Sequence, residues 1–157
     1  MEDFDISLEG NKESNYVDVF VADKEKVLGV IKLKDQIKDG VKESVDDLHK
    51  RDVKTYMFSG DKDRVVEEIA KEVGIDYYKG SLLPEDKVSE IKKIEKDKRI
   101  AFVGDGTNDA PSLASAYLGI SMGSGSDIAI ETSDIVLLKN DISSIVRGID
   151  IAKSCLL

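Results

Sequence analysis

The chain has 157 residues, 41% of them hydrophobic and 35% charged, and its formal net charge is −9. This length suits one domain with a buried core, and the acidic balance argues against a general nucleic-acid binder. The single cysteine, Cys155, excludes an internal disulfide, and no apolar run reaches the roughly 18 residues of a membrane span. No signal peptide is visible. We therefore expect a soluble, cytoplasmic chain that is not itself inserted into a membrane.

The apolar pattern predicts a β-hairpin followed by alternating strands and helices. Residues 1–14 are polar and acidic without a sustained period, which predicts a loosely held lead-in. Apolar residues alternate over 16–22 and 27–33, which predicts two strands joined by a turn. The elements predicted after them are, in chain order, a helix over 38–51, a strand over 53–58, a helix around 65–73 that stops at Gly74, a strand near 75–78, a helix that opens at Pro84, a strand over 100–103, a helix with Leu113 and Ala116, strands over 118–122 and 134–138, and a last helix over 142–152. Strands that alternate with helices of this length predict a parallel α/β sheet.

Residues 100–111 combine a predicted strand with a turn that carries ligand-type side chains. Four apolar residues predict a short buried strand, and the two glycines that follow allow a sharp turn. Asp105, Asn108 and Asp109 place two carboxylates and an amide in that turn, at the carboxyl end of a strand, where open α/β sheets bind ligands. Hard oxygen atoms of this kind are typical Mg²⁺ ligands. The alternative is a turn rich in Asp, Asn and Gly that holds no ion.

Two other short motifs have a functional and a structural interpretation. Ser59-Gly60-Asp61 stands at the end of a predicted strand, so its hydroxyl and backbone N–H groups could hold phosphate oxygens, or it could cap the next helix. Lys87 lies in the first turn of the helix that opens at Pro84, where the helix macrodipole disfavours a cation. A nearby anion would explain this placement, and the alternative is one exposed lysine among many.

Three features predict no chemistry of their own. His49 lies at a polar helix end, so we expect it to be exposed and not to bind metal. The run Lys92–Arg99 is typical of a solvated helix face. Gly123-Ser-Gly-Ser126 lacks the third glycine of a dinucleotide-binding fingerprint.

Taken in order, these motifs resemble the phosphorylation domain of P-type cation-transporting ATPases, which belong to the haloacid dehalogenase superfamily. The motifs are Ser59-Gly-Asp, Pro84-Glu-Asp-Lys87 and, most specific of all, Val103-Gly-Asp-Gly-Thr-Asn-Asp-Ala-Pro111. The stretch 119–138 looks most like the heavy-metal branch, which handles zinc, cadmium, lead or copper. The likeness is strong from Gly29 to about Ala152. It implies a Rossmann-like fold with a mostly parallel sheet and helices on both faces, and ATP hydrolysis coupled to cation transport through an aspartyl phosphate.

The resemblance implies a metal site and a phosphate site. Asp105 would coordinate Mg²⁺, with Asp109 as a second ligand. Asn108 would complete the site and contact the phosphate. Phosphoryl transfer is served by positioning, a divalent ion and positive charge on the transferred group, and residues of these types can supply all three.

The remaining roles fall on the other motifs. Ser59 stands where the family usually has threonine, and its hydroxyl would bind a phosphoryl oxygen. Gly60 would add a backbone N–H, and Asp61 would support the loop. Lys87 would neutralise the transferred phosphoryl group. Asp35 matches an acidic residue at the hinge to the nucleotide-binding domain.

The family's nucleophile is absent from this sequence. The phosphorylated aspartate belongs to an Asp-Lys-Thr-Gly-Thr motif after a first buried strand, and no such string occurs here. Asp3 and Asp5 are poor substitutes, because too few residues precede them to form a buried strand. We therefore expect a truncated piece of a split domain. In it, residues 1–28 would come from the end of the nucleotide-binding domain and its hinge, and residues 29–157 would form the C-terminal part of the phosphorylation domain.

Three functional hypotheses follow. The first is a piece of a heavy-metal pump that works on the cytoplasmic side of the cell membrane, with ATP and the rest of the pump as partners, and that is inactive alone. The second is a free-standing phosphatase of the same superfamily. The third is a non-catalytic module that binds Mg²⁺ or phosphate.

The family's sheet order adds an expectation about topology. It places the missing first strand between the strand that ends at Ser59 and the strand that ends at Gly104. An empty gap would leave backbone groups unpaired in the interior, each at a cost of about 1–3 kcal/mol. We expect a segment from residues 1–33 to fill the gap, with residues 16–22 as the best donor, or else a partner chain in a strand-swapped homodimer.

Overall fold

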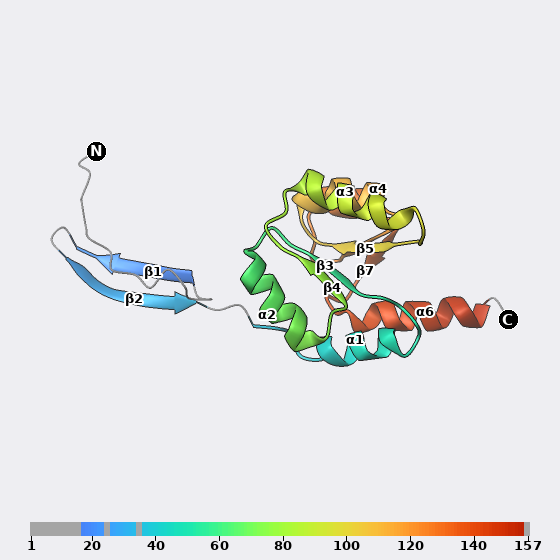
Figure 1. Ribbon diagram of the computed structural model, residues 1–157, viewed down its shortest axis with the longest axis horizontal. Coiled ribbons are helices and arrows are strands. Elements are labelled where there is room, and N and C mark those ends of the chain that lie inside the picture. Colours follow the sequence, from blue (N-terminus) through green and yellow to red (C-terminus); the bar gives the residue numbers. More distant parts are fainter. Residues whose placement is uncertain (1–16, 24–25, 34–35, 156–157) are drawn as a thin grey trace. The chain divides into compact units, whose positions relative to one another are not determined.

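The computed structural model describes residues 17–23, 26–33 and 36–155 (Figure 1). The chain divides between Ile37 and Lys38 into two units. No helix in the described ranges is long and apolar enough to cross a membrane. Asp35, the predicted hinge residue, lies outside the described residues.

The first unit contains the predicted β-hairpin. β1 (Val17–Ala22) pairs antiparallel with β2 (Val27–Leu33), and the turn between them is closed by the Lys26 N–H, which donates to Asp23 Oδ1 at 2.8 Å. Successive side chains of a strand point to opposite faces, and here both faces carry exposed apolar side chains. These side chains, which we call the apolar hairpin faces, are Val19, Phe20, Val21, Leu28, Val30, Ile31 and Leu33. A two-stranded hairpin is marginally stable in water by itself, so these faces are suited to packing against a further element.

The second unit has parallel strands in two sheets. β3 (Tyr56–Phe58) pairs with β4 (Tyr77–Lys79). β5 (Ala101–Gly104), β6 (Leu118–Met122) and β7 (Ile135–Leu137) form a second sheet in that order. The predicted parallel α/β arrangement is confirmed.

Helices cover both sides of these strands. In Figure 1, α3 (Pro84–Glu95) and α4 (Ala110–Ser115) lie on one side, and α1 (Val41–His49), α2 (Asp63–Val73) and α6 (Ser143–Cys155) lie on the other. A short 3₁₀ helix, η1 (Thr107–Asp109), precedes α4, and α5 (Asp127–Thr132) connects β6 to β7. This three-layer arrangement is the predicted haloacid dehalogenase-like architecture.

The gap between β3 and β5 is visible in the pairing. Among the described strands, β3 pairs with β4 alone and β5 with β6 alone, so each keeps an edge without a described backbone partner. The prediction that residues 16–22 fill the gap is wrong for the described part of this segment, because β1 pairs with β2 in the other unit. That a partner chain supplies the strand stays a prediction.

The largest fully buried side chains lie in both helical layers. Ile91 of α3 and Leu113 of α4 are 0% and 1% exposed, and these two helices pack on each other. Val66 and Ala70 of α2 are also fully buried. Each of these helices therefore turns an apolar stripe inward, as its sequence period predicts.

Local chemistry sets two helix ends where the sequence predicts them. α2 ends at Gly74, whose φ of +83° is in the left-handed region that glycine enters without a steric penalty. α3 begins with Pro84, a residue pre-organised for the first helical position, and the Leu83 N–H donates to Asp86 Oδ2 at 3.0 Å.

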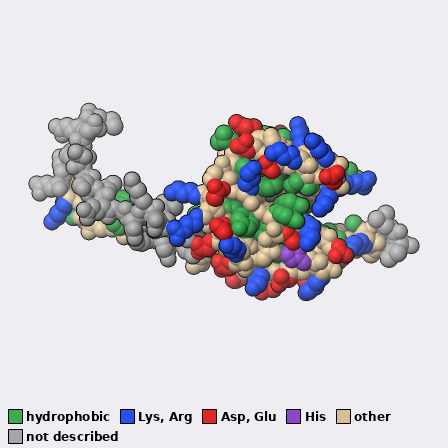
Figure 2. Space-filling model, viewed as in Figure 1, with side chains coloured by type: hydrophobic (Ala, Val, Ile, Leu, Met, Phe, Trp, Pro, Cys, Tyr) green, Lys and Arg blue, Asp and Glu red, His purple; other side chains and the backbone are tan. Residues whose placement is uncertain are grey.

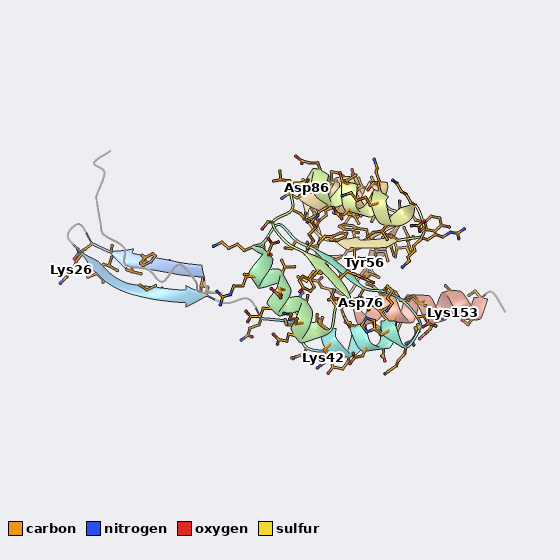
Figure 3. All side chains as sticks on the ribbon, viewed as in Figure 1. Lys26, Lys42, Tyr56, Asp76, Asp86 and Lys153 are labelled. Atoms are coloured by element: carbon orange, nitrogen blue, oxygen red, sulfur yellow. The ribbon has the colours of Figure 1, made fainter. Side chains whose placement is uncertain are left out.

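A polar cluster ties α1 to the beginnings of β3 and β4, and we call it the Asp76 cluster: Asp76, Thr55, His49 and Lys54. Asp76 Oδ2 accepts from the Thr55 N–H at 2.9 Å and the Thr55 hydroxyl at 3.0 Å, and it lies 2.9 Å from His49 Nε2. Lys54 Nζ donates to Asp76 Oδ1 at 3.1 Å. The prediction that His49 is exposed is wrong, since it is half-buried against this carboxylate. Figure 3 shows Asp76 and Tyr56 in the layer of the strands.

The cationic run after the middle of α3 is solvated, as predicted. Lys92, Lys93 and Arg99 are exposed, and Lys and Arg side chains stand out over α3 in Figure 2. Arg99 lies over the ring of Tyr117, with its Cζ 4.8 Å from the ring centroid. The run therefore packs along the surface of its own domain.

Candidate functional site

The predicted metal ligands lie in a tight turn at the carboxyl end of β5. The chain passes from Gly104 through η1 into α4, and the Asp109 N–H donates to the Gly106 carbonyl at 3.0 Å. Pro111 occupies the first turn of α4, as its fixed φ favours. The turn therefore presents Asp105 and Asp109 just beyond the strand.

Gly104 makes room for the Asp109 side chain. A Cβ on Gly104 would lie 2.8 Å from the Cβ of Asp109 and 3.1 Å from its Oδ2. Because such close contacts do not occur between real side chains, only glycine lets Asp109 fold back over the strand end.

Lys87 reaches the same turn from α3. Its Nζ lies 2.8 Å from Asp109 Oδ1, and the side chains of Lys87 and Asp109 are only 14% and 16% exposed. The cation in the first turn of α3 thus has an anion to pair with, as its placement predicted. The partner in this structure is a carboxylate of the protein, and whether Lys87 contacts a phosphoryl group stays a prediction.

A cavity of about 470 Å³ opens at this end of the sheet, and both carboxylates line it. Its wall also includes the strand ends at Gly104 and Met122. The other lining residues are Lys38, Asp39, Val41, Val103, Asn140, Asp141 and Ile142. The cavity therefore joins the Asp105 turn to the beginning of α1 and the segment before α6.

The Ser59 loop is closed on itself. The Ser59 hydroxyl donates to Asp61 Oδ2 at 2.7 Å, and the Asp61 N–H donates back to Ser59 Oγ at 3.2 Å. Asp61 supports the loop in this way, as predicted. No hydrogen bond or ion pair between described residues joins Ser59 or Gly60 to the Asp105 turn, so their phosphate-binding role stays a prediction.

The oxygen atoms in the Asp105 turn fit a hydrated Mg²⁺ ion. Asp105 and Asn108 are exposed and make no hydrogen bond to other described side chains, and Asp109 Oδ2 is left over when Oδ1 pairs with Lys87. In the described part of the chain, no three His, Cys, Asp or Glu side chains are grouped closely enough to hold a metal ion by themselves. Mg²⁺ usually keeps several of its waters and takes one or two carboxylates, so this small donor set suits it.

The loop Gly123–Ser126 contacts this turn, and its sequence pattern did not predict the contact. The Ser126 N–H donates to the Asp105 carbonyl at 2.9 Å. The residues concerned, Gly123–Ser126, stand out in the sequence only as a glycine-serine run. The signal available was its position directly after β6, the neighbour of β5.

Known proteins that are similar to this chain show its family. A family model described as haloacid dehalogenase-like hydrolase matches residues 2–116, and a second model with the same description matches residues 86–149. The chain is 42% identical over 141 residues to a probable copper-importing P-type ATPase A of Enterococcus hirae, which covers 88% of this chain and 19% of that protein. It is 44% identical over 136 residues to a zinc-transporting ATPase of Bacillus subtilis, with 86% and 21% covered.

A solved structure gives the same result in three dimensions. The crystal structure of a zinc-transporting PIB-type ATPase in the E2.Pi state matches with a TM-score of 0.80 and 38% identity, covering 89% of this chain and 23% of that one. The chain thus spans about a fifth of the length of the curated relatives named above. The stretch of the chain that corresponds to part of the heavy-metal P-type ATPases has the same fold as theirs. Because the family model matches residues 2–116, the chain belongs to the haloacid dehalogenase-like hydrolases.

Proposed function

We propose that the chain is the C-terminal part of the phosphorylation domain of a heavy-metal P-type ATPase, on the cytoplasmic side of the membrane. One observation carries the proposal: Asp105 and Asp109 line one cavity at the carboxyl end of β5, and Lys87 is fixed beside them by its 2.8 Å ion pair with Asp109. Residues 29–157 would form this part, and residues 1–28 would belong to the end of the nucleotide-binding domain. ATP and the rest of the pump would be its partners.

Each residue of the site would serve phosphoryl transfer by position and charge. Asp105 and Asp109 would hold Mg²⁺, with Asn108 beside them. A bound Mg²⁺ would supply positive charge to the oxygens of the transferred group. Lys87 would add a second cation on the α3 side, where its stem is already half-buried.

The phosphate oxygens would be contacted by the Ser59 loop. Ser59 would have to exchange its hydrogen bond to Asp61 for one to a phosphoryl oxygen, and the Gly60 N–H would donate beside it. The nucleophilic carboxylate is not among these residues, because the sequence holds no Asp-Lys-Thr-Gly-Thr string. The covalent step therefore needs a segment that this sequence does not contain.

Mg²⁺ should bind weakly at the Asp105 turn, and the Asp105→Asn substitution should abolish that binding. The substitution removes one of two carboxylates from a site that offers few other charged oxygens. Titration of the ¹⁵N-labelled chain with MgCl₂, followed by NMR, should shift the amides of residues 104–110, and the shifts should disappear in the variant.

The matched control is Asp97→Asn, which removes an exposed aspartate next to the end of α3. This variant should bind Mg²⁺ as the wild-type chain does. Mg²⁺-dependent shifts that map far from residues 104–110, or that survive in Asp105→Asn, would show that the ion binds elsewhere.

The chain by itself should form no phosphoenzyme. Incubated with γ-labelled ATP, it should yield no acid-stable, hydroxylamine-sensitive label, and it should not hydrolyse a generic phosphate ester, because the nucleophile is missing. Turnover that is lost in both Lys87→Ala and Asp5→Asn would instead identify a free-standing phosphatase.

A further inference from the structure

The loop after β6 lies against the backbone of Asp105. β5 and β6 are parallel neighbours whose register places Gly104 opposite Ser121, so the segments that follow the two strands meet at the same sheet edge. There the Ser126 N–H donates to the Asp105 carbonyl at 2.9 Å. The contact joins residues 21 positions apart in the sequence, numbers 105 and 126.

Gly125 leaves no space beside Asp105. A Cβ on Gly125 would lie 2.8 Å from the Met122 carbonyl oxygen and 2.9 Å from the Asp105 carbonyl oxygen. Both are backbone atoms, which cannot rotate away as a side chain can. Any larger residue at this position would therefore have to displace the backbone of Asp105 or the end of β6.

The loop is itself held at both ends. The Gly123 N–H donates to the Leu137 carbonyl of β7 at 2.7 Å. At the other end the Ser126 hydroxyl accepts from the Ala129 N–H at 3.2 Å and caps α5, whose Ala129 is fully buried. Because the loop is anchored to β7 and to a buried helix, it can hold the Asp105 turn, which it contacts, in place.

The placement of the Asp105 carboxylate depends on the contact between this loop and the Asp105 backbone. The carboxylate accepts no hydrogen bond from any described residue, whereas the Asp109 carboxylate is paired with Lys87. Because no hydrogen bond holds this side chain, the backbone of Asp105 is what fixes the position and direction of its Cα–Cβ bond, from which the carboxylate reaches the ion. We propose that Gly125 and Ser126 are positioning residues for Asp105, which set the Mg²⁺ site through the Asp105 backbone. This inference rests on the proposed function for its ligand.

The test compares two glycines at which an added Cβ would press on the backbone in different places. In Gly125→Ala the new Cβ lies 2.9 Å from the Asp105 carbonyl oxygen, whereas in Gly80→Ala it lies 2.8 Å from the Asp61 carbonyl oxygen and presses on the chain just before α2. Both substitutions force a close backbone contact, so both should lower the stability. Under conditions where both variants are folded, Gly125→Ala should weaken Mg²⁺ binding roughly tenfold or more, the range typical of residues that orient metal ligands, and Gly80→Ala should not.

A second pair of variants isolates the hydrogen bond. Ser126→Ala removes the cap of α5 but keeps the N–H that Asp105 accepts. Ser126→Pro fits the native φ of −65° but replaces that N–H with a ring carbon. Affinity for Mg²⁺ should fall further in Ser126→Pro than in Ser126→Ala, because only Ser126→Pro removes the N–H that donates to the Asp105 carbonyl. Equal affinities in the two variants would show that this hydrogen bond does not position Asp105.

Hydrogen exchange decides the same question without the metal. The Ser126 amide should exchange slowly in the wild-type chain and in Gly80→Ala, and fast in Gly125→Ala. Equal exchange and equal Mg²⁺ affinity in Gly125→Ala and Gly80→Ala would overturn the inference. Failure of the wild-type chain to bind Mg²⁺ would overturn the proposed function, and the exchange rates would still judge the Gly125 contact.

Discussion

The free energy of unfolding should fall by about 2–3 kcal/mol when Asp76 is replaced by alanine, because a hydrogen bond to a charged group makes a net contribution of about 1.5–3 kcal/mol. The substitution leaves the Thr55 N–H without its acceptor and removes the partner of His49 and Lys54. Urea unfolding followed by far-UV circular dichroism measures the loss.

The effect should depend on pH in a defined direction. The Thr55 N–H, together with Lys54 and His49, holds the pKa of Asp76 well below its usual range. A carboxyl whose pKa is lower in the folded chain than in the unfolded one adds stability above its unfolded pKa, and this is lost as the pH falls through the folded pKa. The wild-type chain and Asp76→Ala should therefore differ most near neutral pH and converge in acid.

Asp47→Ala is the matched control for this cluster. Asp47 pairs with Lys50 on the exposed side of α1, and solvent-exposed pairs of this kind contribute little to stability. Losses of equal size in Asp47→Ala and Asp76→Ala would show that the Asp76 cluster does not tie the strands to α1.

The Leu113→Ala substitution should cost about 2–5 kcal/mol, the range found when a buried leucine is cut back and a cavity remains. Leu113 is 1% exposed and lies in α4, which packs on α3. Because α4 directly follows the turn that carries Asp105, part of the loss should also appear as weaker Mg²⁺ binding. Chemical denaturation gives the stability, and the slope of the unfolding curve shows whether the transition itself has changed.

The same substitution at Leu138 separates burial from residue type. Leu138 is 92% exposed, so Leu138→Ala should change the stability by less than about 0.5 kcal/mol. Similar losses at Leu113 and Leu138 would contradict the packing of α4 on α3.

The sequence predicts those parts of the structure that local chemistry determines. Gly74 ends α2 because it adopts a positive φ, and Pro84 begins α3 because its φ is already helical. The Asp105 turn is equally local, since its glycines, carboxylates and proline follow one another within a few positions. For this reason the strand, the turn and the ligand-type side chains could be located before any coordinates were known.

The contacts that complete the site depend on the register of the sheet instead. Lys87 meets Asp109 because α3 packs on α4, and Ser126 meets Asp105 because β6 pairs with β5. No local sequence pattern encodes either arrangement. The position at which β3 begins also depends on contacts between distant parts of the chain. The strand was predicted over residues 53–58, but β3 begins at Tyr56. Thr55 is a residue type common in strands, but its N–H and hydroxyl donate to Asp76, which is distant in the sequence.

The apolar hairpin faces have a consequence for the isolated chain in concentrated solution. Two strand edges that have no partner among the described strands, beside exposed Val, Ile, Leu and Phe side chains, form a surface that can add strands from another molecule. The net charge of −9 opposes that encounter through mutual repulsion, but salt shortens the range of the repulsion to about 8 Å at physiological ionic strength. Ionic strength therefore sets the colloidal behaviour of this chain: dilute buffer keeps the molecules apart, and concentrated salt lets one hairpin reach another.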